Sequence, residues 1–158
     1  MSIERVFIIG AGLMGHGIAQ VSAAAGKQVT LSDRTADLAE QGKARIGSNL
    51  KRQVDKGKLE QHAADELLGR IATVEGTDGA AGHDIVIEAV FEDEAIKRDT
   101  WQALTKSADA DAILFADQHA AHANVLHDLG PVTAVDGEAG YAPVLEDVDA
   151  GRVSWAAI

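Results

Sequence analysis

The sequence predicts an α/β fold in which a doubly wound parallel sheet carries helices on both faces. Three observations predict this fold: a glycine-spaced turn, an acidic strand end and an alternation of strand and helix patterns. The apolar run at residues 6–9 breaks directly into a glycine-spaced turn at residues 10–15, and a second β-prone run at residues 28–32 ends at the acidic Asp33. Beyond these residues, short β-prone runs alternate with helical periodicity, as expected for strand-helix-strand units with right-handed crossovers.

The turn at residues 10–15 has the sequence Gly-Ala-Gly-Leu-Met-Gly, a dinucleotide-binding pattern of Rossmann type. Gly10 permits the tight turn, Gly12 lets the backbone approach a pyrophosphate, and Gly15 lets the next helix pack close to the sheet. A phosphate would then accept hydrogen bonds from the N–H groups at the helix start. The alternative is a glycine-rich turn that holds no ligand.

Asp33 lies where such folds carry an acidic residue, about 20 residues after the glycine turn. Its carboxylate could accept hydrogen bonds from the two hydroxyls of an adenosine ribose. This favours NAD over NADP, because an aspartate would repel the 2′-phosphate of NADP. The neighbouring Arg34 leaves the alternative open, since an arginine at this position can hold that phosphate.

Helix signals bound the next segments. A helix is expected over residues 13–25 with Leu13, Ile18 and Val21 among its core-facing residues, and Gly26 ends it. A longer helix, capped by Thr35 or Asp37, continues to Gly57 with its core-facing residues at Leu38, Ala44, Ile46, Leu50 and Val54.

The remaining elements follow the same alternation. They are a helix at 63–71, a strand at 71–74, a loop or very short helix at 76–82, a strand at 84–90, a helix at 92–107 and a strand at 111–116. The strand at 84–90 is a continuous apolar run, as in strands buried on both faces of a parallel sheet. In the helix at 92–107, Ile96, Trp101 and Leu104 are expected to point inward.

Composition sets limits on domain number, partners and location. A chain of 158 residues fits one domain, residues 1–158, and is too short for a nucleotide domain with a full substrate domain. The net charge of −11 disfavours nucleic acid and anionic membranes as partners. Without cysteine, disulfides and thiolate chemistry are excluded. No signal-peptide pattern and no apolar run of about 20 residues is present, so a cytoplasmic location is expected.

Three sequence words carry a resemblance to one family. They are Gly10–Gly15 with the Gly-Ile-Ala-Gln of residues 17–20, the Val-Asp-Lys-Gly-Lys-Leu of residues 54–59, and the Ile-Glu-Ala-Val-Phe-Glu-Asp of residues 87–93 with Lys97. Over about residues 3–114 the chain resembles the NAD-binding domain of the 3-hydroxyacyl-CoA dehydrogenases, including the bacterial 3-hydroxybutyryl-CoA dehydrogenases. That family oxidises the 3-hydroxyl of an acyl-CoA to a ketone and passes the hydride to NAD.

The resemblance implies NAD as cofactor and an acyl-CoA as substrate. The implied NAD-binding residues are Gly10, Gly12, Leu13, Met14, Gly15, Asp33, Glu92 and Lys97. Arg52 and Lys56 fall where the family meets CoA. Two alternatives stay open: Lys97 as a surface lysine paired with Asp93, and the basic side of the helix at 35–57 as a solvated face.

After residue 114 the resemblance stops. The family continues with a Ser-Asn-Thr-Ser word that holds the substrate hydroxyl and a His-Phe-Phe-Asn-Pro word that carries the general base, and neither word occurs in this chain. Continuing the register places His119 where the serine would be. A strand end could place Asp117 and His119 near the nicotinamide as an acid and a base, so these two are weak catalytic candidates. By this register we expect the chain to lack the family's helical closing domain as well, and therefore to bind NAD better than it catalyses turnover.

Composition changes in the tail at residues 115–158, which hold no lysine, one arginine and seven acidic residues. We hypothesise a frameshift or a replacement of the catalytic segment, with simple drift of a family member as the alternative. On a helix, His119 and His122 would lie one turn apart and could both ligate zinc, but His127 would lie about 80° round from His119. We therefore expect histidines on a solvated helix and no metal site. Short strands at 132–135 and 144–148 and a packing role for Trp155 are expected.

The sequence therefore leaves three functional hypotheses. The first is a 3-hydroxyacyl-CoA dehydrogenase domain, which oxidises 3-hydroxyacyl-CoA to 3-oxoacyl-CoA with NAD. The second is a non-catalytic NAD-binding module or a truncated or frameshifted remnant. The third is a related hydroxy-acid or sugar-acid dehydrogenase of the lambda-crystallin group. An exposed apolar face on a shortened sheet would favour a homo-oligomer.

Overall fold

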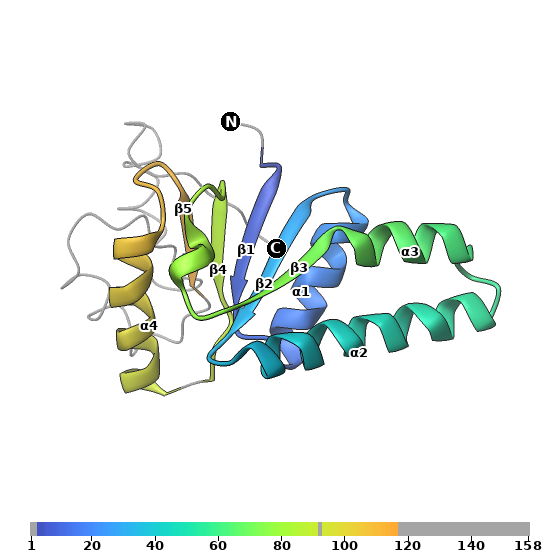
Figure 1. Ribbon diagram of the computed structural model, residues 1–158, viewed down its shortest axis with the longest axis horizontal. Helices are drawn as coiled ribbons and strands as arrows, with labels where there is room; N and C mark the ends of the chain where they lie inside the picture. The colour runs from blue at the N-terminus through green and yellow to red at the C-terminus, as the bar shows by residue number, and fades with distance from the viewer. Residues whose placement is uncertain (1–2, 92, 117–158) are drawn as a thin grey trace, which may run out of the picture.

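The computed structural model describes residues 3–91 and 93–116. Five parallel strands form one sheet in the order β3-β2-β1-β4-β5 (Figure 1). The strands are β1 (Arg5–Ile9), β2 (Gln28–Asp33), β3 (Ile71–Glu75), β4 (Ile85–Glu88) and β5 (Ile113–Ala116). This is the predicted Rossmann-type doubly wound sheet, because the chain moves outward from β1 to β3 and then returns to the other side of β1.

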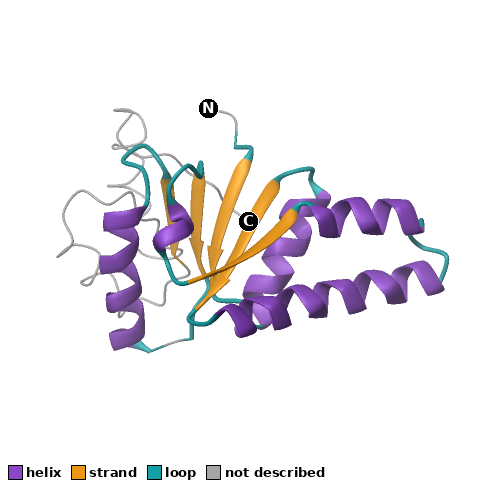
Figure 2. Cartoon of the chain, viewed as in Figure 1, coloured by secondary structure: helices purple, strands orange, loops and turns teal. Residues whose placement is uncertain are grey.

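Helices cover both faces of the sheet, with α4 and η1 on one side and α1, α2 and α3 on the other (Figures 1 and 2). Their bounds are α1 (Leu13–Ala24), α2 (Ala36–Asp55), α3 (Gln61–Gly69), the 3₁₀ helix η1 (Asp78–Ala80) and α4 (Glu94–Ser107). The alternating side chains of β1 supply both cores. Val6 and Ile8 pack on the side of α1 and α2, and Phe7 and Ile9 on the side of α4.

Local signals at the helix ends act as predicted. Thr35 caps α2 by accepting a hydrogen bond from the N–H of Leu38 at 3.4 Å. Gly26 and Gly57, which follow α1 and α2, adopt positive φ angles of 83° and 65°. The strand predicted at 84–90 is shorter, Ile85–Glu88, and the helix predicted at 63–71 begins at Gln61.

The inward faces of three helices differ from the prediction. In α2, Ala44 is exposed, whereas Ile46 and Leu50 are buried as expected. In α1, Leu13 and Val21 are 84% and 70% exposed. The buried face consists of Gly15, His16, Ala19 and Ala23. Gly15, Ala19 and Ala23 are small because α1 packs closely against the sheet.

In α4, Ile96 is 44% exposed, whereas Trp101 and Leu104 are buried as predicted. Lys97 lies on the inner face in place of Ile96, with 3% of its surface exposed. The inner positions 97, 101 and 104 follow the helical spacing i, i+4, i+7.

Several predictions concern residues outside the described part of the chain. These are the roles of Glu92, Asp117, His119, His122, His127 and Trp155 and the strands at 132–135 and 144–148. Within the described residues, no cluster of histidine, aspartate or glutamate could hold a metal ion. None of the described helices has both the length and the apolar character that crossing a membrane requires.

Candidate functional site

The glycine turn joins β1 to α1 at the carboxyl edge of the sheet, where ligands bind in doubly wound folds. Gly10 has a φ of +107°, and a Cβ atom there would lie 2.4 Å from the Ala89 carbonyl oxygen. A Cβ atom on Gly15 would lie 1.6 Å from the Gly10 carbonyl oxygen. These two glycines are therefore required by the protein's own packing.

Gly12 differs from its two neighbours in the turn. A Cβ atom there would meet no atom of the described residues within 4 Å, apart from its chain neighbours. Gly12 is also the N-cap residue of α1, so the unpaired N–H groups and positive dipole end of that helix lie beside an open space. The free volume fits an anionic ligand that approaches the backbone.

Asp33 lies at the end of β2 and reaches back to the glycine turn. Its Oδ2 atom accepts the N–H of Ala11 at 2.8 Å, and its Oδ1 atom accepts the N–H of Arg34 at 2.7 Å. Each carboxylate oxygen can accept more than one hydrogen bond, so further donors such as ribose hydroxyls can be accommodated. The N–H of Ala11, in the glycine turn, thus helps to fix the orientation of the Asp33 side chain.

Two further contacts fix the turn from neighbouring elements. The N–H of Gly10 donates to the Ser32 carbonyl oxygen at 2.8 Å. On α2, a Cβ atom on Gly42 would lie 2.7 Å from the Ala11 Cβ atom and 2.8 Å from the Ala11 carbonyl oxygen. Gly42 therefore lets α2 approach the turn, a role that the sequence interpretation did not assign.

His16, which the sequence analysis also passed over, lies in the first turn of α1. The residue is 8% exposed, and its Nδ1 atom lies 2.5 Å from the Gly12 carbonyl oxygen. A carbonyl oxygen only accepts hydrogen bonds, so Nδ1 carries the proton. The imidazole thereby tethers the beginning of α1 to the residue that borders the open space.

A buried ion pair closes the other side of the turn. Glu88 ends β4 and is 1% exposed, and its Oε2 atom lies 3.6 Å from the Nζ atom of Lys97. Its Oε1 atom accepts the N–H of Val90 at 2.9 Å. Lys97 is therefore a buried cation paired with Glu88 at the end of β4, and the alternative of a surface lysine paired with Asp93 is wrong.

A groove of about 500 Å³ runs between α1 and α2 next to the turn. Leu13 and His16 line it from α1, and Arg45, Asn49 and Arg52 are among its lining residues from α2. Arg52 donates to Asn49 Oδ1 at 2.5 Å. Lys56 follows α2 as its C-cap residue and donates its N–H to the Arg52 carbonyl oxygen at 3.3 Å, but it is not among the groove-lining residues.

Comparison with known proteins places the chain in a family. Residues 5–126 match the model of the 3-hydroxyacyl-CoA dehydrogenase NAD-binding domain. The chain belongs to this family. The match extends beyond residue 114, where the sequence resemblance was taken to stop, and NAD is the cofactor of the family's domain.

Individual relatives agree. A 3-hydroxybutyryl-CoA dehydrogenase of Bradyrhizobium diazoefficiens is 42% identical over 73% of this chain and 39% of its own length. The mitochondrial hydroxyacyl-coenzyme A dehydrogenase of Rattus norvegicus is 41% identical over 72% of this chain and 38% of its own. The chain thus spans about two fifths of the length of these relatives.

A solved structure shows the same fold. The (S)-3-hydroxybutyryl-CoA dehydrogenase of Ralstonia eutropha superimposes with a TM-score of 0.73 at 31% identity, over 78% of this chain and 45% of that one. The fold prediction and the family resemblance are both confirmed.

Proposed function

We propose that the chain binds NAD or NADH at the carboxyl edge of its sheet. In this proposal the pyrophosphate lies against the glycine turn, Gly10, Gly12 and Gly15, and the start of α1. The observation that carries the proposal is the open space at Gly12, flanked by the two glycines that the fold itself requires. Leu13 and Met14, which are 84% and 60% exposed at the start of α1, lie beside the same space and would pack against the cofactor.

Asp33 is assigned to the adenosine ribose. Its carboxylate is held by the N–H groups of Ala11 and Arg34, which orients it at the edge of the turn. A second negative charge on a 2′-phosphate would be repelled there, so NADH is preferred to NADPH. Arg34 is exposed and could instead hold the 2′-phosphate of NADPH. Comparing the affinities of NADH and NADPH distinguishes the two cases.

Glu92 and Lys97 are assigned to the nicotinamide half of the cofactor. Lys97 supports this assignment by its burial next to the turn. Glu92 remains an assignment from the family resemblance alone, because it lies outside the described residues.

For the complete protein, we propose NAD-dependent oxidation of a 3-hydroxyacyl-CoA to the 3-oxoacyl-CoA, with bound NAD accepting the hydride. Arg52 and Lys56 are assigned to the CoA moiety, and Arg52 has the stronger support because it lines the groove beside the turn. Catalytic residues stay unassigned, with Asp117 and His119 as candidates. The alternative is a non-catalytic NAD-binding module, favoured by the missing serine and histidine words.

Calorimetric titration of the full chain with NADH and NADPH tests cofactor binding. NADH is expected to bind in the micromolar range. Asp33→Ala should weaken NADH binding by about tenfold to a hundredfold, the value of one or more hydrogen bonds to a charged group. Asp65→Ala, an exposed aspartate on α3, is the matched control and should bind NADH like the unmodified chain. Absence of binding to both nucleotides would refute the proposal.

Turnover separates the two function classes. Reduction of acetoacetyl-CoA by NADH, followed at 340 nm, should stay near background for a non-catalytic module. A rate well above background would instead assign catalysis to this chain. We also propose that the chain forms a homo-oligomer, which light scattering after size-exclusion chromatography tests. A cytoplasmic location is proposed as well, and fractionation of the host cell tests it.

A further inference from the structure

Glu88 is a buried carboxylate that contacts two different parts of the candidate site. Only 1% of it is exposed, and it pairs in register with Ile9, the residue directly before the glycine turn. Its two oxygens point to different partners, the N–H of Val90 and the ammonium of Lys97. One side chain therefore joins the end of β4 to α4.

The contact with Val90 supports the base of the turn. A Cβ atom on Gly10 would lie 2.9 Å from the Val90 nitrogen, so the Val90 peptide lies directly against Gly10. The preceding Ala89 donates its N–H to the Ile9 carbonyl oxygen at 2.8 Å. Glu88 thus holds the backbone segment on which Gly10 rests.

The contact with Lys97 places a cation at the same edge. Burying a carboxylate and an ammonium costs solvation free energy that their attraction offsets only partly, so such a pair is weak evidence for a role in stability. An ammonium has three N–H donors, so pairing with Glu88 is compatible with donating to a ligand hydroxyl. The pair instead fits an orienting role for Lys97.

We propose that Glu88 is a positioning residue of the cofactor site, which holds Lys97 and the Val90 peptide in place for the nicotinamide half of NAD. This inference rests on the proposed function. It assigns to Glu88 a task that differs from those of Asp33 and the glycines, which would hold the adenosine and pyrophosphate. ADP contains the adenosine and the two phosphates but no nicotinamide. Its affinity therefore reports on Asp33 and the glycines and not on Glu88.

A double-mutant cycle on the full chain tests the proposal. Glu88→Gln, Lys97→Met and the double variant are each titrated with NADH and with ADP. Glutamine keeps a carbonyl oxygen that can accept the Val90 N–H, so the base of the glycine turn should stay in place in Glu88→Gln. Each single substitution should therefore weaken NADH binding about tenfold and leave ADP affinity within about twofold. The double variant should bind NADH no more weakly than Lys97→Met alone, because both changes remove the same interaction.

Two controls separate positioning from a general structural role. Lys106→Met changes a lysine in the last turn of the same helix and should leave NADH and ADP affinity unchanged. The fluorescence of bound NADH, which reports the surroundings of the nicotinamide, should change in Glu88→Gln and not in Lys106→Met. A purely structural Glu88 would instead weaken NADH and ADP equally, and that result would overturn the proposal.

Folding of the variants is followed by thermal unfolding. If Glu88→Gln does not fold, the uncharged double variant is compared directly with Lys97→Met, and unequal NADH affinities would overturn the proposal. If the unmodified chain binds neither NADH nor ADP, the proposed function fails together with this inference. If it binds both and Glu88→Gln leaves their affinity ratio unchanged, only the role of Glu88 fails.

Discussion

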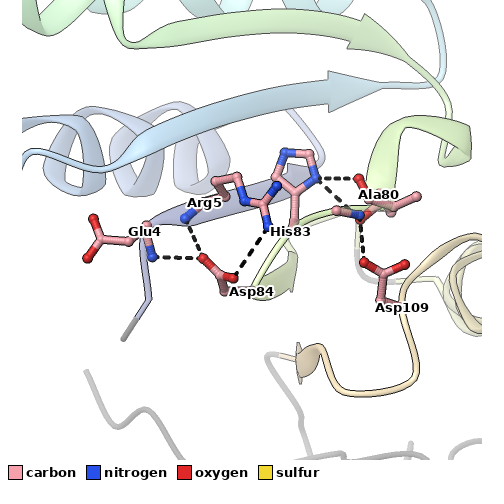
Figure 3. Close-up of polar contacts among 8 residues, drawn as sticks. Glu4, Arg5, Ala80, His83, Asp84 and Asp109 are labelled. Carbon is pink, nitrogen blue, oxygen red and sulfur yellow. Dashed lines mark hydrogen bonds and ion pairs between the residues drawn. The ribbon is translucent and has the colours of Figure 1, made fainter. Parts of the chain in front are cut away.

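At the amino edge of the sheet, Asp84 accepts the N–H groups of Glu4 and Arg5 at 2.8 and 2.7 Å, and the Arg5 guanidinium lies 3.8 Å from its other oxygen (Figure 3). At the carboxyl edge, Asp33 accepts one N–H on each oxygen and borders the open space at Gly12. Both edges use carboxylates to orient backbone. Among the residues that the structure describes, the carboxyl edge combines its carboxylate with a helix N-terminus and an open space at Gly12.

The two edges therefore differ in role: the polar groups of the amino edge hold the backbone in place, and those of the carboxyl edge border the candidate binding site. Nearby, Asp109 likewise accepts the N–H of Gly82 at 2.8 Å and fastens the amino edge (Figure 3). His83 donates its Nδ1 proton toward the carbonyl oxygens of Ala80 and Ala81 at 3.3 and 3.2 Å. These groups bond to protein partners, and substitutions there should therefore change stability without changing cofactor affinity.

Gly15→Ala should have the largest effect, because it removes the turn itself. The new Cβ atom would lie 1.6 Å from the Gly10 carbonyl oxygen, a backbone atom that cannot move alone. We expect a loss of at least about 3 kcal/mol in the free energy of unfolding, measured in urea, together with loss of NADH binding. Unfolding like the unmodified chain would show that the turn is not held as described.

Gly12→Ala sharpens the comparison, because the new Cβ atom would meet no described atom within 4 Å beyond its chain neighbours. The free energy of unfolding should stay within about 0.5 kcal/mol of the unmodified value. NADH affinity should fall about tenfold or more, because the methyl group occupies the space proposed for the pyrophosphate. Gly17→Ala, also without protein contacts, is the matched control and should bind NADH normally. Normal binding by Gly12→Ala would move the cofactor away from this turn.

Gly42→Ala tests how far the binding edge depends on α2. Its Cβ atom would press on the Ala11 carbonyl oxygen, so we expect about 1–3 kcal/mol of destabilisation and weaker NADH binding through the displaced Ala11. Gly47→Ala is the control on the same helix, because its nearest contact would be an ordinary 3.6 Å from Leu68. It should be neutral or stabilising, since alanine favours a helix by about 1 kcal/mol over glycine. Equal effects of the two substitutions would contradict close packing at Gly42.

The fold was predictable because its signals are local. The apolar run that forms β1 supplies side chains to both cores. Thr35 caps the start of α2 and Gly57 follows its end, as the sequence predicts. The glycine turn and Asp33 were predictable for the same reason, since their spacing reflects the path of one strand-helix-strand unit.

The buried ion pair was missed because hydrophobicity ranks isoleucine above lysine. Ile96 was therefore placed inward, although Lys97, Trp101 and Leu104 have the i, i+4, i+7 spacing of one helix face. Burial of a lysine becomes acceptable only when a partner such as Glu88 is near, and that partner lies on the preceding strand. The spacing could have identified Lys97, but only the tertiary structure supplies Glu88.

Gly42 shows a second limit. It lies on the buried face of α2 with Ala39 and Ile46, where a sequence pattern records only a small residue. The reason for a glycine is the Ala11 backbone, which reaches it through the packing of α2 on the turn. Close approaches between distant segments leave no local periodicity.

Asp84→Asn should have the smallest effect and confine it to stability. The N–H groups of Glu4 and Arg5, and more weakly the Arg5 guanidinium, hold the pKa of Asp84 below its ordinary value of 3.8, although burial acts in the opposite direction. The stability that this carboxylate contributes is therefore complete above pH 3.8 and is lost as the pH falls through the lowered pKa. The variant should unfold at a lower temperature at pH 7 and lose less stability on acidification than the unmodified chain.

Thermal unfolding between pH 2.5 and 7 measures this, with the exposed Asp99→Asn on α4 as the control expected to follow the unmodified chain. NADH affinity at pH 7 should be the same for Asp84→Asn and the unmodified chain, because Asp84 fastens the edge opposite the glycine turn. A clear loss of NADH affinity would mean that the amino edge sets the geometry of the carboxyl edge through β4. In that case Asp84 and Glu88, at opposite ends of the same strand, would act on one site, and the separation between fastening and binding would fail.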